Sequence, residues 1–226
     1  MTSATQDIEI DIDKSEICKY MGYDNGSRPT GRIASLIDEY TENAPSLIQP
    51  SYSYTVKDIE LVYGSLVVVE DMAVLQSKTL AGLLEHCEKV AVFIATIDDH
   101  LENMSKWLIK NGLMLQASCL DAIGSVAVQS VADAAREQIE RIASRGNLVL
   151  SRHLSPGWCD WDTEQQRAIF QAVDGSSIGV RLTDGCLMIP QKSVSGIIGL
   201  GTPDSGADTY NPCKKCDKID CPERIL

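Results

Sequence analysis

Apolar positions along this chain repeat with the two periods that secondary structure imposes. Short runs rich in β-branched and alternating apolar residues favour strands. These runs are Tyr52–Val69, Val90–Ile97, Leu148–Leu150, Ile178–Leu182, Cys186–Ile189 and Val194–Leu200. Gly, Pro, Asn and Asp punctuate the intervals between them, which is typical of turns. The pattern therefore predicts a sheet that is assembled from several separated segments.

Helical spacing of apolar residues occupies the intervals between several of these runs. Helices are predicted at Gly31–Asn43, Ser77–Cys87, Asp98–Asn111, Leu113–Arg145 and Thr163–Val173. The fourth is the longest, and its apolar residues are mostly small and recur every three or four positions, which predicts close packing against a sheet or another helix. We expect a single α/β (α+β) domain with a twisted, mainly antiparallel sheet flanked by helices.

The chain changes character near both ends. Residues 1–49 combine a short alternating stretch, turn residues and a polar helix, and are predicted to form an N-terminal arm. Residues 50–202 carry the predicted sheet and the long helix, and form the core. Residues 203–226 are polar and rich in turn residues and cysteine, and form a separate C-terminal tail.

Charge and hydropathy exclude several classes of function. The 226 residues include 20 Lys and Arg against 32 Asp and Glu, a net charge of −12 that disfavours nucleic acid and anionic membrane surfaces. The longest apolar runs are far short of the roughly 20 residues of a membrane helix. The acidic N-terminus lacks a basic start and an apolar signal region, so we expect a cytoplasmic protein. Its eight cysteines are then expected to be core thiols or ligands rather than disulfides.

The segment Ser151–Trp161 holds the first candidate site. Ser155-Pro-Gly157 predicts a rigid turn with exposed backbone amides, Arg152 can bind a carboxylate, and Trp158 and Trp161 can stack on a flat ring. Such a set suits a small zwitterionic or nucleoside ligand. A structural turn with two interface tryptophans is the alternative. Glu137 on the long helix can likewise be a ligand carboxylate or a solvated acid.

Three clustered cysteines form the second candidate site, Cys213-x2-Cys216-x4-Cys221 followed by Pro222. Three thiolates at this spacing can ligate zinc or three corners of an iron–sulfur cluster. The fourth ligand remains open between Cys159, Cys186, His153, another chain and an exogenous group. Unligated thiols on the tail are the competing interpretation.

Other motifs lose support on their spacing. Asp98-Asp-His100 does not match a corrinoid-binding loop, because Asn103 stands where that pattern requires Gly, and it is interpreted as helix-capping charge. No nucleophile elbow, phosphate-binding Gly-rich loop or zinc-protease helix motif is present. Gly199–Asp204 lacks the third Gly and the helix of a dinucleotide loop. Hydrolase, kinase and dehydrogenase functions are therefore disfavoured.

Three ordered motifs together resemble a known family. They are Leu120–Val128 with Ala132-Asp-x3-Glu137, then Arg152 with Ser155-Pro-Gly-Trp158, then Ser193-Val-Ser-Gly196. In this order they resemble the activation (reactivation) domain of cobalamin-dependent methionine synthase, most closely its stand-alone versions, over roughly residues 50–202. The resemblance implies the fold expected above and an accessory activation subunit. That subunit binds S-adenosylmethionine and presents its methyl group to an oxidised corrinoid while a flavodoxin or ferredoxin supplies an electron.

The resemblance also implies roles for individual residues. Glu137 matches the acid that holds the ligand's amino group, and Arg152 or its neighbour His153 matches the arginine that holds the carboxylate. Ser155, Gly157 and Trp158 match the turn lining the methionine and adenosine parts, with Trp158 replacing the more usual Tyr. The corrinoid-facing positions are then Ser193, Ser195 and Gly196.

Two departures from the family pattern are visible. Arg152 lies five residues before Gly157, one more than in the fused synthase domain, so His153 occupies the expected arginine position. The fused domain has no cysteine tail, which suggests that Cys213, Cys216 and Cys221 carry an iron–sulfur cluster passing the electron, with structural zinc as the competing interpretation. The implied partner is a cobalamin-bearing methionine synthase or another corrinoid protein. A non-catalytic corrinoid-docking module and an iron–sulfur electron-transfer protein are the alternative functions.

Overall fold

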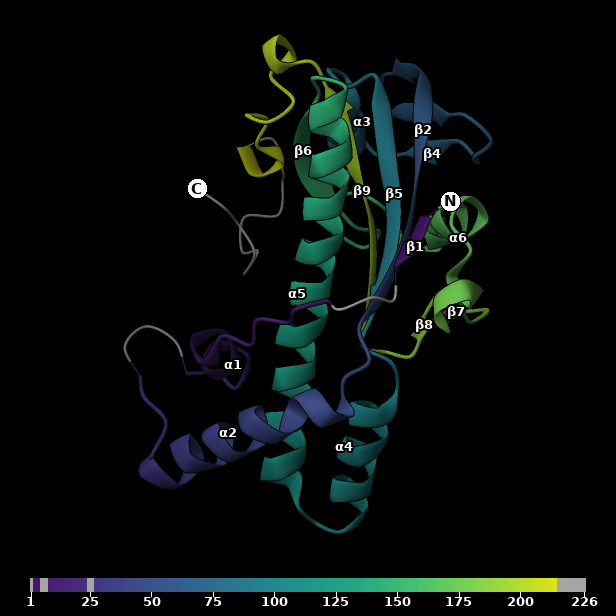
Figure 1. The fold of residues 1–226 in the computed structure, drawn as a ribbon. Helices are drawn as coiled ribbons and strands as arrows, with labels where there is room; N and C mark the ends of the chain where they lie inside the picture. Colours follow the sequence, from purple (N-terminus) through teal and green to yellow (C-terminus); the bar gives the residue numbers. More distant parts are fainter. Residues whose placement is uncertain (1, 5–7, 24–26, 215–226) are drawn as a thin grey trace.

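The computed structural model describes residues 2–4, 8–23 and 27–214, and its central feature is an antiparallel sheet (Figure 1). Its strands are β1 (Thr2–Ala4), β2 (Ser51–Tyr63), β3 (Leu66–Val69), β4 (Leu75–Gln76), β5 (Lys89–Thr96), β6 (Val149–Leu154) and β9 (Ser193–Gly201). They lie in the order β4-β3-β2-β5-β9-β6, and β1 also pairs with β2. The expected fold class, with its mainly antiparallel sheet and flanking helices, is confirmed.

Helices and short 3-10 turns complete the described chain. The helices are α1 (Lys14–Tyr20), α2 (Gly31–Asn43), α3 (Lys78–Leu84), α4 (His100–Lys110), α5 (Met114–Arg145) and α6 (Gln166–Ala172). The 3-10 turns are η1 (Ala44–Leu47), η2 (Thr163–Gln165), η3 (Gly175–Ile178), η4 (Pro203–Ser205) and η5 (Pro212–Lys214). No helix in the described part of the chain is both long and apolar enough to cross a membrane.

The sheet is buried on both faces, which explains why its central strands do not alternate in polarity. Ala91, Phe93 and Ala95 of β5 pack in a cluster with α5, whereas Val92 and Ile94 pack in a second cluster with α3 and α6. Every residue of β5 after Lys89 is buried. A strand covered on both faces reads as a continuous apolar run, as the sequence of β5 does.

The long helix α5 organises the first face. Its buried stripe is mostly alanine and valine, and these small side chains let it lie close to β5, β9 and β6. The N-terminal arm crosses the same helix, and the Asp11 backbone N–H donates to Ser130 Oγ at 2.9 Å (Figure 1). Ile17 of α1 and Ile37 of α2 are buried in the α5 cluster. The arm therefore belongs to the packed body, although the proposed division at residues 49 and 202 stays a prediction.

The segment between α6 and β9 differs from the prediction. Ile178–Leu182 and Cys186–Ile189 were expected as strands, but only β7 (Arg181–Leu182) and β8 (Met188–Ile189) are extended. These two pair with each other in a separate hairpin rather than joining the main sheet. The predicted ranges were too long because a 3-10 turn ends at Ile178 and the turn around Asp184 takes up the polar residues.

Candidate functional site at the edge strand

The predicted ligand-binding residues gather at one edge of the sheet. Strand β6 is the last in the strand order and pairs only with β9 among the described strands, so its second side lies at the margin beside α5 (Figure 1). Arg136 of α5 links the two elements, because its Nη1 donates to Ser151 O at 2.8 Å. This hydrogen bond joins α5 to β6 shortly before the turn 155–161 begins.

The turn after β6 is closed by its own backbone. Trp158 N–H donates to Ser155 O at 3.1 Å, Trp161 N–H to Trp158 O at 2.9 Å, and Gly157 N–H to Trp161 O at 2.7 Å. Gly157 has φ +92°, a left-handed conformation that glycine adopts without strain. The expected turn is therefore present and needs a glycine at its centre, but the Gly157 and Trp158 N–H groups are hydrogen-bonded within it and not left exposed as expected.

The two tryptophans of this turn have different surroundings. Trp158 is 41% exposed, whereas Trp161 is 1% exposed and packs in the cluster with α3 and α6. The expectation that both can stack on a ligand is thus wrong for Trp161, because its side chain fills the core beneath the sheet. Trp158 retains a free aromatic surface for a flat ring.

Asp160 fastens the turn to α3. Its carboxylate accepts from Ser77 Oγ at 2.7 Å and from the backbone N–H of Lys78 and Thr79 at 2.6 and 3.1 Å. Partial burial opposes ionisation, but these donors and the Thr79 hydroxyl outweigh it and lower the pKa of Asp160 to about 2. The carboxylate is therefore ionised at neutral pH and holds the turn against the first residues of α3.

His153 lies between two aromatic rings on the α5 face. Its ring centroid is 6.2 Å from that of Phe93 in an edge-on contact and 5.0 Å from that of Trp158. Desolvation lowers its pKa, the Arg136 charge acts in the same direction, and Asp133 opposes both. The imidazole is therefore neutral at pH 7, and its buried Nε2 has no hydrogen-bond partner among the described residues.

A second unsatisfied polar atom lies close by. Ser155 is 6% exposed, and its buried Oγ also has no partner in the described structure. A Cβ built on Gly196 would lie 3.1 Å from that Oγ and 2.8 Å from Leu154 O, so β9 and the end of β6 approach closely here. Buried polar atoms are rarely left unpaired, so His153 and Ser155 together indicate a place for an added ligand or water.

Glu137 and Arg152 are both exposed, and no described contact joins them. Glu137 follows Arg136 directly and lies four residues after Asp133, so it shares with Asp133 the face of α5 that borders β6. The structure thus gathers His153, Ser155, Gly157 and Trp158 at the end of β6 and in the turn that follows, whereas Glu137 is exposed on α5 and Arg152 is exposed on β6.

Sequence reasoning gave no role to Arg136 or to Asp133, although Asp133 stands in one of the three motifs that carry the family resemblance. Both charges act on His153, and Asp133 Oδ1 accepts from Gln129 Nε2 at 3.3 Å. The available signal was a row of polar residues at three- and four-residue spacing on a helix otherwise made of small apolar ones.

The residues expected to face a corrinoid lie inside β9. Ser193 and Ser195 are 8% and 2% exposed, and Gly196 is buried. Ser193 Oγ lies 2.9 Å from Thr96 Oγ1 and 2.7 Å from Pro190 O. Ser193 therefore has a structural role within the sheet, whereas the buried Ser195 Oγ has no hydrogen-bond partner among the described residues, and contact of these positions with a corrinoid stays a prediction.

The cysteine site is only partly covered by the structure. Cys213 lies in η5, which contacts α3, whereas Cys216 and Cys221 fall outside the described residues. Of the candidate fourth ligands, Cys159 lies close enough to Tyr210 for its charge to raise the Tyr210 pKa, behind the larger effect of burial. Cys186 is buried with its Sγ 3.8 Å from Glu164 O, and His153 lies between Phe93 and Trp158.

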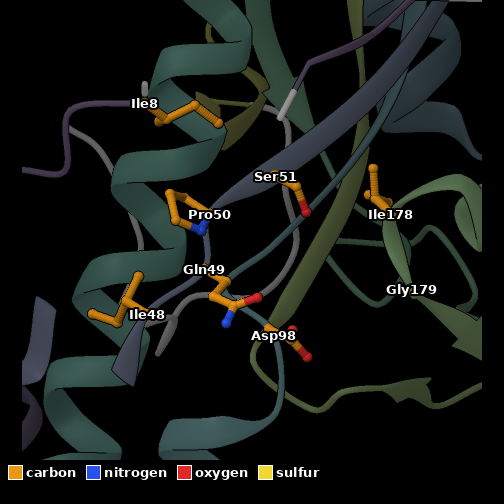
Figure 2. A pocket seen from close by; sticks show the side chains of 8 residues that line it. All are labelled: Ile8, Ile48, Gln49, Pro50, Ser51, Asp98, Ile178 and Gly179. Atoms are coloured by element: carbon orange, nitrogen blue, oxygen red, sulfur yellow. The ribbon is translucent and has the colours of Figure 1, made fainter. Parts of the chain in front are cut away.

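A cavity of about 640 Å³ lies away from these residues (Figure 2). Gln49, Ser51 and Asp98 line it, and Ile178 and Gly179 face them across the opening. None of the predicted site residues lines this cavity.

The charges beside the cavity do not cap α4 in the expected way. Asp99 is the N-cap residue of α4 but makes no side-chain capping bond, while Asp98 Oδ1 accepts from Asp99 N–H at 2.6 Å. The ligand atoms of Asp98, Asp99 and His100 lie within 4.8 Å of one another, and Asp99 and His100 are exposed.

The main sheet and its long helix define an α+β domain. No protein-family model and no curated protein matches the sequence. Among solved structures, the chain is similar to the MetH reactivation domain bound to AdoHcy, with a TM-score of 0.62 and 13% sequence identity. The match covers 83% of this chain and 73% of that chain. At this level of identity the likeness establishes the shared fold.

Proposed function

We propose that this chain is an accessory subunit that binds S-adenosylmethionine and supports reductive reactivation of a corrinoid methyltransferase such as methionine synthase. The observation that carries the proposal is the pair of unsatisfied buried atoms, His153 Nε2 and Ser155 Oγ, together with the exposed Trp158 ring, whose centroid lies 5.0 Å from that of His153. It is supported by the fold shared with a domain that was solved with AdoHcy. The resemblance of the three sequence motifs supports the same ligand class.

Each residue of the site has a task that fits its chemistry. Trp158 offers a flat surface for the adenine, and Ser155 and Gly157 line the ligand with a hydroxyl and a close backbone. Glu137 pairs with the amino group. Arg152 is the residue that the family pattern assigns to the carboxylate, although it is exposed.

The chain's contribution is to hold the methyl donor in position. The methyl carbon leaves the sulfonium sulfur, whose bonding pair stays with S-adenosylhomocysteine, and bonds to the cobalt of the partner's corrinoid. The pair for the new bond comes from the metal after a flavodoxin or ferredoxin has supplied one electron. No group of this chain has to gain or lose a proton in that step, so catalysis here rests on proximity and orientation.

The partner and setting follow from the same proposal. A corrinoid protein with a basic docking surface suits the net charge of −12, and charge complementarity speeds such encounters. A cytoplasmic location is proposed, where flavodoxin- or ferredoxin-type donors operate. A corrinoid-docking module that does not bind S-adenosylmethionine is the competing function.

Calorimetric titration of the full chain with S-adenosylhomocysteine and S-adenosylmethionine tests the proposal. Glu137→Gln is expected to weaken both affinities at least about tenfold, because it removes the charge that pairs with the amino group. Glu42→Gln, an exposed helix glutamate of α2, is the matched control and should leave both unchanged. If neither ligand binds, with or without a cobalamin-bearing methionine synthase, the docking module replaces this proposal.

A second function is proposed for the cysteine tail. Three thiolates at the Cys213-x2-Cys216-x4-Cys221 spacing suit a metal centre, and the fourth ligand is open between Cys159, Cys186, His153, another chain and an exogenous group. An iron–sulfur cluster here would pass the electron that reactivation requires, whereas zinc would stabilise the tail.

Metal analysis of anaerobically purified protein decides between these centres. We expect iron and acid-labile sulfide in a ratio near one, with visible absorbance that Cys216→Ser abolishes. Zinc without sulfide would identify a structural site, and the absence of both metals would remove the metal hypothesis. Cys18→Ser, in α1, is the matched control and should not change the metal content.

A further inference from the structure

The amino-acid part of an S-adenosyl ligand carries a carboxylate, so its site needs a cation. Around His153 and Trp158 the described residues offer three candidates, namely Arg136, Arg152 and His153 itself. They differ in charge state, burial and fixation, and these differences select one of them.

His153 is excluded as the cation by its surroundings. It is enclosed by Phe93 and Trp158, and desolvation together with the Arg136 charge lowers its pKa. Asp133 favours the charged form but does not reverse the shift. At neutral pH the ring can donate or accept a hydrogen bond, but it has no charge to offer a carboxylate.

Arg152 has the required charge but not the required position. Its side chain is exposed on the open side of β6, where water screens an ion pair and leaves it weak. Apart from its backbone carbonyl, which accepts from Ser151 Oγ at 2.7 Å, no described contact holds this residue.

Arg136 combines charge, partial burial and fixation. Its Nη1 donates to Ser151 O at 2.8 Å, which orients the guanidinium along the margin of β6. Its charge reaches His153, and within the described residues no carboxylate oxygen lies within 4.0 Å of it. A guanidinium has five N–H donors, so one bond to a carbonyl leaves a fork for a carboxylate.

We infer that Arg136, rather than Arg152, binds the carboxylate of the ligand's amino-acid part. The inference rests on the proposed function and deepens it. Glu137, next along α5, and Asp133, one turn before, then lie beside that carboxylate and hold the amino group. The helix, and not the turn, would thus recognise the amino acid, while Trp158 recognises the nucleoside.

Two ligands separate this role from a general effect on the fold. S-adenosylhomocysteine carries the amino-acid group, whereas 5′-methylthioadenosine has the same nucleoside and sulfur but neither the α-carboxylate nor the α-amino group. The full-length chain and its Arg136→Gln, Arg136→Lys and Arg152→Gln variants are titrated with both ligands, and circular dichroism and thermal unfolding confirm that each variant is folded.

Arg136→Gln is expected to weaken the affinity for S-adenosylhomocysteine about ten- to a hundredfold while changing the affinity for methylthioadenosine less than twofold. Arg136→Lys, which keeps the charge but loses the fork, should fall between wild type and Arg136→Gln. Arg152→Gln tests the rival cation, and the inference predicts that it changes the affinity for neither ligand more than about threefold.

Three results would overturn the inference. The first is an unchanged affinity of Arg136→Gln for S-adenosylhomocysteine. The second is an equal loss of affinity of Arg136→Gln for both ligands. The third is a loss of affinity of Arg152→Gln for S-adenosylhomocysteine alone. A wild-type chain that binds neither ligand, even with the corrinoid protein present, would instead overturn the proposed function, and no comparison between variants can produce that result.

Discussion

Replacing Trp161 with alanine is expected to destabilise the protein by about 3–5 kcal/mol, the usual range for truncating a buried tryptophan. The side chain is 1% exposed and packs in the cluster beneath the sheet with α3 and α6. Its backbone also closes the turn, through Gly157 N–H to Trp161 O at 2.7 Å. Chemical denaturation followed by circular dichroism measures the loss, and ligand binding should fall with it because the turn loses its support.

Trp158→Ala is the matched control for that variant. Trp158 is 41% exposed, so its removal should change the free energy of unfolding by less than about 1 kcal/mol. Its loss should nevertheless weaken the binding of S-adenosylhomocysteine, because the aromatic surface on which the adenine stacks is removed. Equal destabilisation by the two variants would contradict the division of the turn into a core tryptophan and a ligand tryptophan.

Gly196→Ala is expected to destabilise the protein by about 1–3 kcal/mol, the range for overpacking a close-packed interior. The added Cβ would meet Leu154 O at 2.8 Å, Ser155 Oγ at 3.1 Å and Phe93 Cε1 at 3.2 Å. The first of these atoms belongs to the backbone, so relief requires β6 and β9 to separate. Thermal unfolding measures the effect.

Gly31→Ala provides the comparison for Gly196→Ala. Gly31 begins α2, and nothing lies within 4 Å of a Cβ built there. Alanine at that position should raise the free energy of unfolding by up to about 1 kcal/mol, because it restricts the unfolded chain without a steric conflict. A destabilisation of the same size in both variants would show that the close approach at Gly196 is not the cause.

Most of the fold was predictable because its elements have strong local signals. The repeated small apolar residues placed α5 to within a residue at its start, and the apolar run Val90–Ile97 located β5. The ranges predicted for β7 and β8 were too long, because part of a short apolar stretch can equally lie in a turn or a 3-10 helix. Their separation from the main sheet depends on contacts that no local pattern reports.

The candidate site was predictable in its turn and less so in its charges. Ser155, Gly157 and Trp158 lie in one turn, so their proximity follows from sequence alone. Arg136 and Asp133 reach His153 only because α5 packs along β6, a contact between distant segments. The burial of Trp161 likewise depends on α3, which lies far from it in sequence, as well as on the nearby α6.

The strand order of the sheet also constrains how this chain can reach its native state. Strand β9 is near the end of the chain, yet it lies between β5 and β6 and pairs with both. During synthesis, the apolar face of β5 and the whole of β6 emerge long before their common partner does. Such long-range pairing slows folding and leaves apolar strand edges exposed in the meantime. The edge at which we propose that the ligand binds therefore forms only after Gly201 has been synthesised, and a nascent chain that ends earlier lacks the pairing of β6 with β9.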